Sequence, residues 1–239
     1  MAKAYLEIED IERLENATDF LSDKLLIRLL FHAAGRVSEV IALEVPNIDF
    51  EQGTITIPHL KQRIALACPV CGARLGRGHS FCPKCGTKVT QAISKQQEER
   101  RVRTVPLDKV TLGMLRDYIQ RGGPVEKNGK KFIFGITRTR AYQIIRECAR
   151  QARLPPLVNP ETGKLRGISP HRLRDAFATH AMKIDDSGDG QRKLQEFLGH
   201  ENFNTTARYR KISGEEQKQW YDNVLKKMET NNHGSDQAQ

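Results

Sequence analysis

Apolar residues recur three and four positions apart through much of the chain, a spacing that places them on one face of a helix. The first such segment runs from Ile11 to Ala34, with Asp19 or Ser22 as its candidate cap. A second helix is expected directly afterwards, capped by Ser38 and ending before Pro46. The continuous apolar face of the first segment predicts a core helix.

Alternation of polar and apolar residues replaces this pattern in the next part of the chain. Ile48–Phe50 and Gly53–Pro58 are short runs rich in Ile and Thr on either side of a Glu-Gln-Gly turn. The next alternating run, Arg101–Leu107, is displaced along the chain, and the segment between has a different composition. We therefore expect an antiparallel hairpin that carries an insertion.

Helical spacing returns in the remainder of the chain. Pro106–Gln120 is amphipathic and is broken by Arg121–Pro124, and a further helix is expected from Thr137 to about Leu154. Ser169-Pro170 predicts another helix start, and Glu215–Met228 is again amphipathic. The predicted fold class is therefore mainly α with a small antiparallel β-sheet.

Polar segments are expected to connect these elements. The stretch from Pro124 to Phe132 and residues Asn159–Gly167 are interpreted as loops. Asp185–Gly190, with Glu196 downstream, partly matches an EF-hand calcium loop, but Arg192 stands where such a loop needs an apolar residue. We interpret this segment as a polar connector rather than a calcium site.

Charge and hydropathy narrow the class of protein. The 239 residues carry a formal charge of +10, of which the first 23 residues contribute −5 and the rest +15. A basic body favours a polyanion such as nucleic acid, although many basic proteins share this charge. The most apolar window, Leu25–Ala34, contains Arg28 and His32, so neither a signal peptide nor a membrane span is expected.

Four of the five cysteines form two Cys-x-x-Cys-Gly motifs within the insertion. This spacing lets four thiolates converge on one structural Zn²⁺, and the glycine after each pair lets the backbone turn. Doubled pairs indicate metal binding in a reducing compartment, and we expect a cytoplasmic protein. The expected ligands of this zinc-ribbon-like insertion, residues 65–92, are Cys68, Cys71, Cys82 and Cys85. His79 is an alternative ligand but is read as a surface residue, and Cys148 as a small core residue.

His, Arg, His and Tyr follow one another in a fixed order towards the end of the chain. The helix that starts at Pro170 would bring His171 and Arg174 to one face, and Gly199-His200 and Tyr209 follow. This array resembles the C-terminal signature of the tyrosine recombinases, the integrase family that cuts and rejoins DNA through a phosphotyrosine. Further upstream, Gly-Arg-Val-Ser-Glu at residues 35–39 is similar to the family motif that carries the first catalytic arginine.

The resemblance covers roughly Leu25 to Tyr209, apart from the insertion, which typical family members lack. It implies a DNA breaking-rejoining fold in which two arginines clamp the reacting phosphate and a tyrosine attacks it. The implied catalytic residues are Arg36, Lys61, His171, Arg174, His200 and Tyr209, with Glu39 supporting Arg36 and Lys95 as the alternative lysine. Neither a catalytic metal nor a nucleotide is implied.

The helix that begins near Thr137 carries hydroxyl groups and arginines at its N-terminus. A helix N-terminus favours anions, so this cluster suits contact with a phosphate or a groove. In recombinases the matching helix lies against DNA, and the implied contacts are Thr137, Arg138 and Arg140. The implied partner is double-stranded DNA, on which the enzyme would act as a homotetramer.

The catalytic domain is expected over residues 1–228, followed by a disordered polar tail at 229–239. Recombinases usually carry a helical N-terminal domain that completes a clamp around DNA, so the chain is expected to be either truncated or a natural minimal form. The first hypothesis is a site-specific recombinase or integrase of a mobile element. The alternatives are a type IB topoisomerase and a DNA-binding accessory protein that no longer cuts, although the intact catalytic series argues against the latter.

Overall fold

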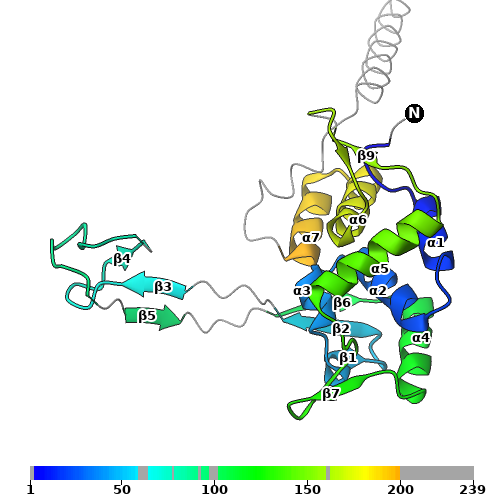
Figure 1. The fold of residues 1–239 in the computed structure, drawn as a ribbon, viewed down its shortest axis with the longest axis horizontal. Helices are drawn as coiled ribbons and strands as arrows, with labels where there is room; N and C mark the ends of the chain where they lie inside the picture. The colour runs from blue at the N-terminus through cyan, green and yellow to red at the C-terminus, as the bar shows by residue number, and fades with distance from the viewer. Residues whose placement is uncertain are drawn as a thin grey trace, which may run out of the picture. The chain divides into compact units, whose positions relative to one another are not determined.

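The computed structural model of the chain describes residues 3–58, 64–76, 78–90, 93–96, 102–159 and 162–199 (Figure 1). Among these, residues up to 177 together with 197–199 form one compact unit, and residues 178–196 belong to a second. The helices are α1 (Ile8–Asn16), α2 (Leu21–Phe31), α3 (Val37–Ile41), the 3₁₀ turn η1 (Val45–Asn47), α4 (Lys109–Gln120), α5 (Arg138–Gln151), α6 (Pro170–Ile184) and α7 (Gly188–Leu198).

The strands are short and all of their pairings are antiparallel. The main sheet has the order β1-β2-β6, with β1 (Ile48–Asp49), β2 (Thr54–Pro58) and β6 (Val102–Pro106). The insertion holds a separate sheet in the order β4-β3-β5, with β3 (Ile64–Ala67), β4 (Arg74–Leu75) and β5 (Ile93–Gln96). Two hairpins complete the described strands, β7 (Val125–Lys127) with β8 (Lys130–Phe132), and β9 (Leu157–Val158) with β10 (Leu165–Arg166).

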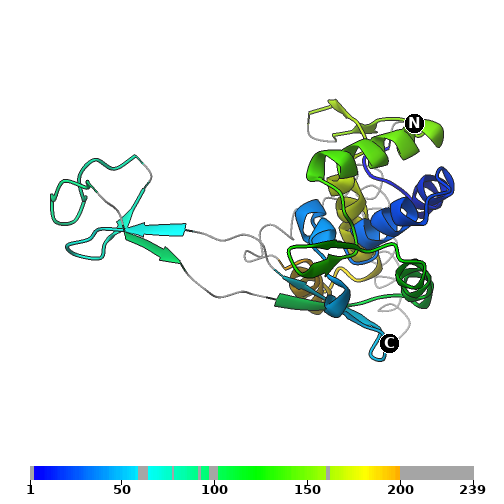
Figure 2. The same cartoon turned by 60° about the horizontal axis from the view of Figure 1, so that its bottom comes forward.

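The interrupted hairpin is confirmed by the pairing of β2 with β6. The register runs from Thr54 opposite Pro106 to Pro58 opposite Val102, and Figure 2 shows the two strands side by side. Ile55 and Ile57 of β2 are each 1% exposed. Because alternate residues of a strand share a face, these positions bury one side of the sheet and fix its register.

The first helical segment is two helices rather than one. The break falls after α1, where the hydroxyl of Thr18 accepts a hydrogen bond from the backbone N–H of Phe20 (3.2 Å), a local bond that competes with helical pairing. Phe20, rather than Asp19 or Ser22, precedes the first residue of α2 and makes no side-chain cap. The expected cap residues were therefore wrong, although the apolar periodicity was correct.

A sharp turn joins α2 to α3. Ala34 has a φ of 44°, in the left-handed region, and α3 begins at Val37, so Ser38 lies inside the helix and is not its cap. A Cβ atom at Gly35 would lie 2.3 Å from Cγ2 of Val40. Only glycine therefore permits this close approach of the turn to α3.

Both segments expected to be loops contain hairpins. Asn128 and Gly129 join β7 to β8 with φ angles of 52° and 70°. Two central residues with positive φ are typical of a type I′ turn, for which Asn-Gly is the preferred sequence. Residues 159–164 likewise connect the paired strands β9 and β10, so the loop interpretation was wrong at these two places.

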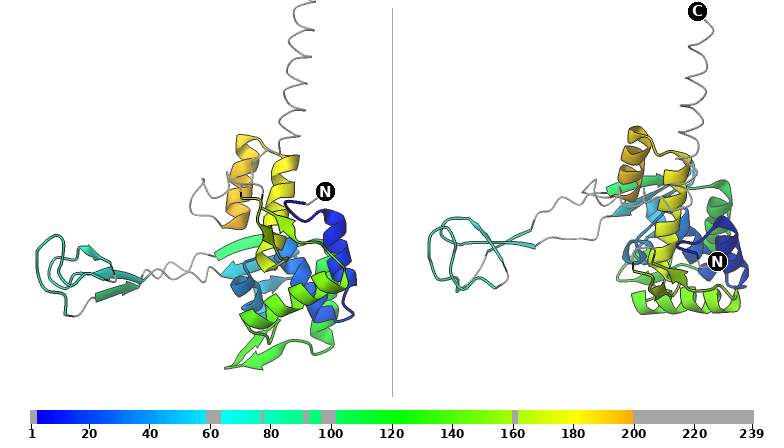
Figure 3. Two further views of the ribbon diagram at one scale, coloured as in Figure 1. Left: turned by 45° about the horizontal axis from the view of Figure 1, so that its top comes forward. Right: turned by 90° about the horizontal axis from the view of Figure 1, so that it is seen from above.

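The main apolar core of the first unit includes residues of α1, α2, α4 and α5, and α2 contacts each of the other three helices. Figure 3 shows these helices in two further views. The side chains of Leu25, Leu29 and Leu115 are fully buried in it. Leu173 and Ala176, on the first part of α6, join the same cluster. Cys148 of α5 is 3% exposed within it, which confirms its assignment as a small core residue.

Both α4 and α5 begin at side-chain caps. Asp108 accepts hydrogen bonds from the backbone N–H of Thr111 (2.9 Å) and from Nη2 of Arg28 (2.9 Å). At α5, the hydroxyl of Thr137 accepts from the backbone N–H of Arg140 (3.2 Å). Such caps satisfy N–H groups that have no partner within the helix.

Removal of the Asp108 cap should destabilise the protein. We expect Asp108→Ala to lower the free energy of unfolding by about 1–2 kcal/mol, because the variant loses both a cap and one of the partners of Arg28. Asp117→Ala, on the same helix, removes only the exposed ion pair with Arg121 and should cost about 0–0.5 kcal/mol. Urea unfolding followed by far-UV circular dichroism measures both. Equal losses in the two variants would contradict the role of the cap.

Candidate active site and metal centre

Arg174 is a buried cation that joins distant parts of the chain. Arg174 is only 2% exposed. Its Nη1 donates to the carbonyl oxygen of Ala34, and its Nη2 donates to the carbonyl oxygen of Leu198 (2.6 Å). Ala34 lies two residues before Arg36, and Leu198 lies two residues before His200. One guanidinium group therefore fixes the backbone beside two other residues of the expected catalytic set.

Glu39 lies between two arginines. Its carboxylate accepts from Nη1 of Arg36 (2.6 Å), from the backbone N–H of Arg36 (3.1 Å) and from Nη2 of Arg103 (2.9 Å). Burial raises the pKa of Glu39, but the charge of Arg103 and the hydrogen bond from Arg36 outweigh it, so the pKa lies below its ordinary value. The ionised carboxylate thus holds Arg36 in place, as its expected supporting role requires.

Arg103 is a component of this site that the sequence interpretation missed. Besides pairing with Glu39, its Nη1 donates to the carbonyl oxygen of Phe197 (2.7 Å). A Cβ atom at Gly199, whose φ is 64°, would lie 3.2 Å from Cδ of Arg103. Arg103 therefore packs against Phe197 and Gly199 at the end of α7 and links them to Glu39.

A signal for Arg103 was present in the strand pattern. Arg103 lies two positions before Val105, which is fully buried, and so shares its face of β6. The Arg103 side chain is only 12% exposed. A charged residue at a core-facing position needs a charged or hydrogen-bonding partner, and this requirement indicates a buried ion pair.

His171 and Arg174 have different environments although they are three residues apart on α6. The His171 side chain is 53% exposed, and its Nε2 lies 3.6 Å from Oδ1 of Asp175. Asp175 also pairs with Arg172 at 2.9 Å. The helix starts at Pro170, as predicted, so His171 lies in its first turn while Arg174 reaches the core.

The remaining expected catalytic residues, Lys61, His200 and Tyr209, lie outside the described residues. Lys95, the alternative lysine, is on β5, where it pairs with Ala65 of β3 within the sheet of the insertion. The described structure therefore brings together Arg36, Glu39 and the segments held by Arg174.

The expected DNA contacts lie at the start of α5. Thr137, Arg138 and Arg140 are all exposed, and Cζ of Arg138 lies 5.7 Å from the ring centroid of Tyr142. These side chains are accessible to a large ligand, and their contact with DNA remains a prediction.

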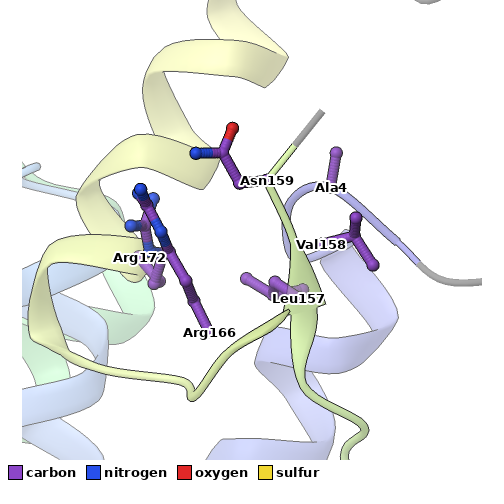
Figure 4. A pocket seen from close by; sticks show the side chains of 6 residues that line it. All are labelled: Ala4, Leu157, Val158, Asn159, Arg166 and Arg172. Carbon is purple, nitrogen blue, oxygen red and sulfur yellow. The ribbon is translucent and has the colours of Figure 1, made fainter. Parts of the chain in front are cut away.

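A small pocket lies beside the β9–β10 hairpin and the start of α6. Figure 4 shows the side chains of Arg166 and Arg172 close together on one side of it and Leu157 and Val158 on the other. Arg172 already pairs with Asp175, and none of the expected catalytic residues lines the pocket. Among the described residues, Arg172 and Asp175 connect this pocket to His171, whose Nε2 lies 3.6 Å from Asp175.

The four paired cysteines converge as the sequence predicts. All four sulfur atoms lie within 4.8 Å of one another, with Cys68 and Cys85 at 3.7 Å and Cys71 and Cys82 at 3.5 Å. The edge of a tetrahedron with Zn–S bonds of typical length is about 3.8 Å. The group therefore has the spacing of a metal site.

Each cysteine pair forms the same turn. The N–H of Gly72 donates to the carbonyl of Cys68, and the N–H of Gly86 to that of Cys82, both at 2.9 Å. The two glycines have φ angles of 69° and 71°, which agrees with their expected role. His79 is exposed and lies outside the cysteine group, as predicted.

The hydroxyl of Thr87 lies 3.3 Å from the sulfur of Cys85, and this hydrogen bond, with one from the Thr87 backbone, lowers the pKa of Cys85 to about 6. A lowered pKa favours the thiolate, which is the form that binds metals.

The segment that partly matches a calcium loop shows no comparable cluster. Asp185 accepts hydrogen bonds from the hydroxyl and the N–H of Ser187, and no group of acidic ligands gathers there among the described residues. The connector is shorter than expected, because α7 begins at Gly188 and only residues 185–187 lie between α6 and α7.

Glu39 gives the site a testable dependence on pH. Its pKa is lowered on folding, so its stabilisation is present above its ordinary pKa of about 4.5 and is lost as the pH falls through the folded value. We expect Glu39→Gln to lower the free energy of unfolding by about 2–3 kcal/mol at neutral pH. The difference from the wild type should shrink on acidification.

Urea unfolding at a series of pH values measures this difference. Glu147→Gln, which alters an exposed pair with Arg150, serves as the control and should have little effect. A Glu39→Gln effect that is constant down to acidic pH would contradict the ionised pair.

No helix among the described residues is long and apolar enough to cross a membrane.

The family model described as "Phage integrase family" matches residues 4–77 and 82–216. Tyrosine recombinase XerD of Neisseria meningitidis serogroup B is 28% identical over 220 residues, which cover 89% of this chain and 56% of the relative. XerD of Listeria innocua serovar 6a is 24% identical over 222 residues, with 87% and 58% covered. The chain thus spans about half the length of the curated relatives it matches.

Solved structures have the same fold. The crystal structure of XerA recombinase matches with a TM-score of 0.62 at 16% identity and covers 93% of this chain and 64% of that one. XerH site-specific recombinase bound to palindromic difH substrate matches with a TM-score of 0.59 at 18% identity, with 92% and 52% covered. The mainly helical fold with small antiparallel sheets is therefore confirmed as that of a tyrosine recombinase catalytic domain. Since the family model covers most of its length, the chain belongs to the phage integrase family of tyrosine recombinases.

Proposed function

We propose that this chain is the catalytic domain of a site-specific DNA recombinase or integrase, which cleaves and rejoins double-stranded DNA through a 3′-phosphotyrosyl intermediate. The observation that carries the proposal is the buried Arg174 guanidinium, which binds the carbonyl groups of Ala34 and Leu198. These contacts hold two separate backbone segments against Arg174, which is one of the two arginines expected to bind the phosphate. The family membership supports the same reaction.

The reaction is a pair of transesterifications. The phenolic oxygen of Tyr209 attacks phosphorus and the bond to the 5′ oxygen breaks, which leaves a 3′-phosphotyrosine and a 5′-hydroxyl. Lys61 donates the proton to the departing oxygen, with Lys95 as the alternative, and His171 assists proton transfer. Attack by a 5′-hydroxyl of another strand reverses the sequence and rejoins the DNA.

Arg36 and Arg174 stabilise the extra negative charge on the non-bridging oxygens of the five-coordinate phosphorus. Guanidinium groups suit this role because they are planar, always charged and able to bind two oxygens at once. His200 donates a further hydrogen bond to the phosphate. Glu39 and Arg103 are positioning residues: Glu39 orients Arg36 and Arg103 through ion pairs at 2.6 Å and 2.9 Å, and Arg103 holds the carbonyl of Phe197 at 2.7 Å.

Double-stranded DNA is the proposed substrate, with Thr137, Arg138 and Arg140 as backbone contacts. A palindromic site, of the kind in the XerH structure, presents the same half-site twice. The two protein chains bound to the two half-sites are related by the two-fold symmetry of the DNA. Recombination brings two such sites together. We therefore propose a homotetramer on DNA, acting in the cytoplasm on a mobile element.

Domain limits follow from the same proposal. The catalytic domain takes residues 1–228, residues 65–92 form the zinc-ribbon-like insertion, and 229–239 form a polar tail. The insertion sheet formed by β3, β4 and β5 pairs only within itself among the described strands, which supports a separate module.

Tyr209→Phe should abolish covalent attachment to DNA and leave duplex binding nearly unchanged, since only the attacking oxygen is removed. Tyr221→Phe is the matched control and should attach as the wild type does. Incubation with a pool of nicked suicide duplexes, followed by denaturing gel electrophoresis, measures attachment. A covalent complex that persists in Tyr209→Phe but disappears in Tyr221→Phe would identify Tyr221, rather than Tyr209, as the nucleophile.

We propose further that the four cysteines bind one structural Zn²⁺. The sulfur separations of 3.5 and 3.7 Å are close to those expected for four sulfur ligands placed tetrahedrally around Zn²⁺. The apolar cluster of the insertion is small and contains two of the ligands themselves, Cys68 and Cys82, with Leu75 as its third buried member. A module with so little apolar burial needs the metal for its folding energy.

Protein purified without chelators should contain one zinc ion per chain and retain it in EDTA. Cys85→Ser should lose the ion, whereas the matched control Cys148→Ser should retain it, because Cys148 lies in the core of the first unit. Atomic emission analysis measures the zinc, and circular dichroism should show the helices intact in both variants. Zinc-free wild-type protein would refute this assignment.

A further inference from the structure

The insertion at 65–92, taken together with the whole of its flanking strands β3 and β5, has an unusual charge composition. Residues 64–96 contain no Asp or Glu, although these make up 29 of the 239 residues of the chain. Its cations are Arg74, Arg77, Lys84, Lys88 and Lys95. Four thiolates and one Zn²⁺ contribute two negative charges, so five positive charges leave the loaded segment at a formal +3. Two of the sulfur ligands, Cys68 and Cys82, belong to buried residues, whereas Arg74, Lys84 and Lys88 are exposed.

An aromatic side chain lies among these cations. Phe81, one residue before the second cysteine pair, is 59% exposed. It forms an antiparallel bridge with Lys88, and directly opposite residues of an antiparallel pair project to the same side. Lys84 lies between Cys82 and Cys85 in the turn that the bridge closes, and both lysines are exposed. The second cysteine turn thus presents a ring beside two ammonium groups.

We propose that this ribbon surface, defined as Phe81, Lys84 and Lys88, is a second DNA-binding site of the protein. This surface binds the phosphate backbone of double-stranded DNA. The two lysines contact phosphates, and the phenyl ring packs against the adjacent sugar or base edge. Ammonium groups contribute to such binding by releasing counterions from the phosphates, independently of sequence. The inference rests on the proposed function only in that the same protein acts on DNA.

The surface fits DNA better than it fits another protein. Protein interfaces bury a contiguous apolar centre from which charged residues, and lysine in particular, are depleted. Among the described residues of the insertion, the large apolar side chains that are exposed are Phe81 and Val70, and both lie beside cysteine turns rather than in an apolar patch. A segment whose charged side chains are all positive is instead typical of surfaces that bind nucleic acid, and Phe81 adds a single exposed ring to it.

Salt titration of DNA binding tests this inference in the full-length, zinc-loaded chain. The slope of log K against log salt reports the number of phosphate contacts, at about 0.9 for each contact. Lys84→Gln/Lys88→Gln should therefore reduce the slope by about 2, measured by fluorescence anisotropy with a labelled mixed-sequence duplex. Phe81→Ser should weaken binding and leave the slope unchanged, since it removes no charge.

Lys127→Gln/Lys131→Gln is the matched control, because it removes the same charge from exposed positions on the β7–β8 hairpin. Its slope should equal that of the wild type. Equal reductions in both double variants, or no reduction in either, would overturn the inference, as would lysine variants that lose a protein partner but bind DNA normally. Zinc content is measured for each variant so that every comparison uses loaded protein.

The covalent attachment assay separates this inference from the proposed function. A slope difference in a protein that never attaches to nicked duplexes would support the ribbon surface and refute the recombinase activity. Attachment at the wild-type rate together with an unchanged slope in the lysine variants would support the recombinase and refute the ribbon surface.

Discussion

The site depends on a charge that is buried and held by backbone rather than by a carboxylate. Arg174 is 2% exposed, and its two terminal nitrogens donate to carbonyl groups that are 140 and 24 residues away in the chain. A buried guanidinium is tolerated only where its donors are satisfied, so these turns and this side chain require one another. The separation of the two nitrogens is fixed by the planar group, and lysine cannot reproduce it. The position of Arg174 thereby also determines the course of the backbone at Ala34 and Leu198.

Glu39 extends the same constraint to the sheet. Its carboxylate joins Arg36 at the start of α3 to Arg103 on β6, and Arg103 continues to the carbonyl of Phe197. A helix start, a strand and the end of α7 are therefore connected through charged groups that are mostly shielded from water. In such surroundings ion pairs are stronger and less screened by salt than on the surface, so the geometry of this site should depend little on ionic strength.

Sequence reasoning succeeded where the determining forces are local. The periodicity of α2, α4 and α5, the alternation in β2 and β6, and the cysteine spacing all correspond to observed elements. It missed the β7–β8 hairpin although Asn128-Gly129 is the preferred sequence for its turn, because the flanking strands are exposed and lack an alternating pattern.

The site itself was only partly accessible from the sequence. The resemblance identified Arg36, Glu39 and Arg174 as site residues, but no local pattern indicates that Arg174 reaches Ala34 and Leu198. Arg103 shows the same limit, since strand alternation indicates only that it needs a partner, and its actual partners are separated from it by 64 and 94 residues. Contacts between segments so far apart are set by the packing of the whole core rather than by neighbouring residues.

The pairing of β2 with β6 also bears on how the fold accommodates its additional segment. Pro58 and Val102 are opposite one another at the last pair of the ladder, so the inserted segment leaves and re-enters the sheet at adjacent points. The register of the two strands is fixed by buried residues such as Ile55 and Val105, not by the length or content of what lies between. A change in the length or sequence of the inserted segment can therefore leave the same residues of β2 and β6 facing the core.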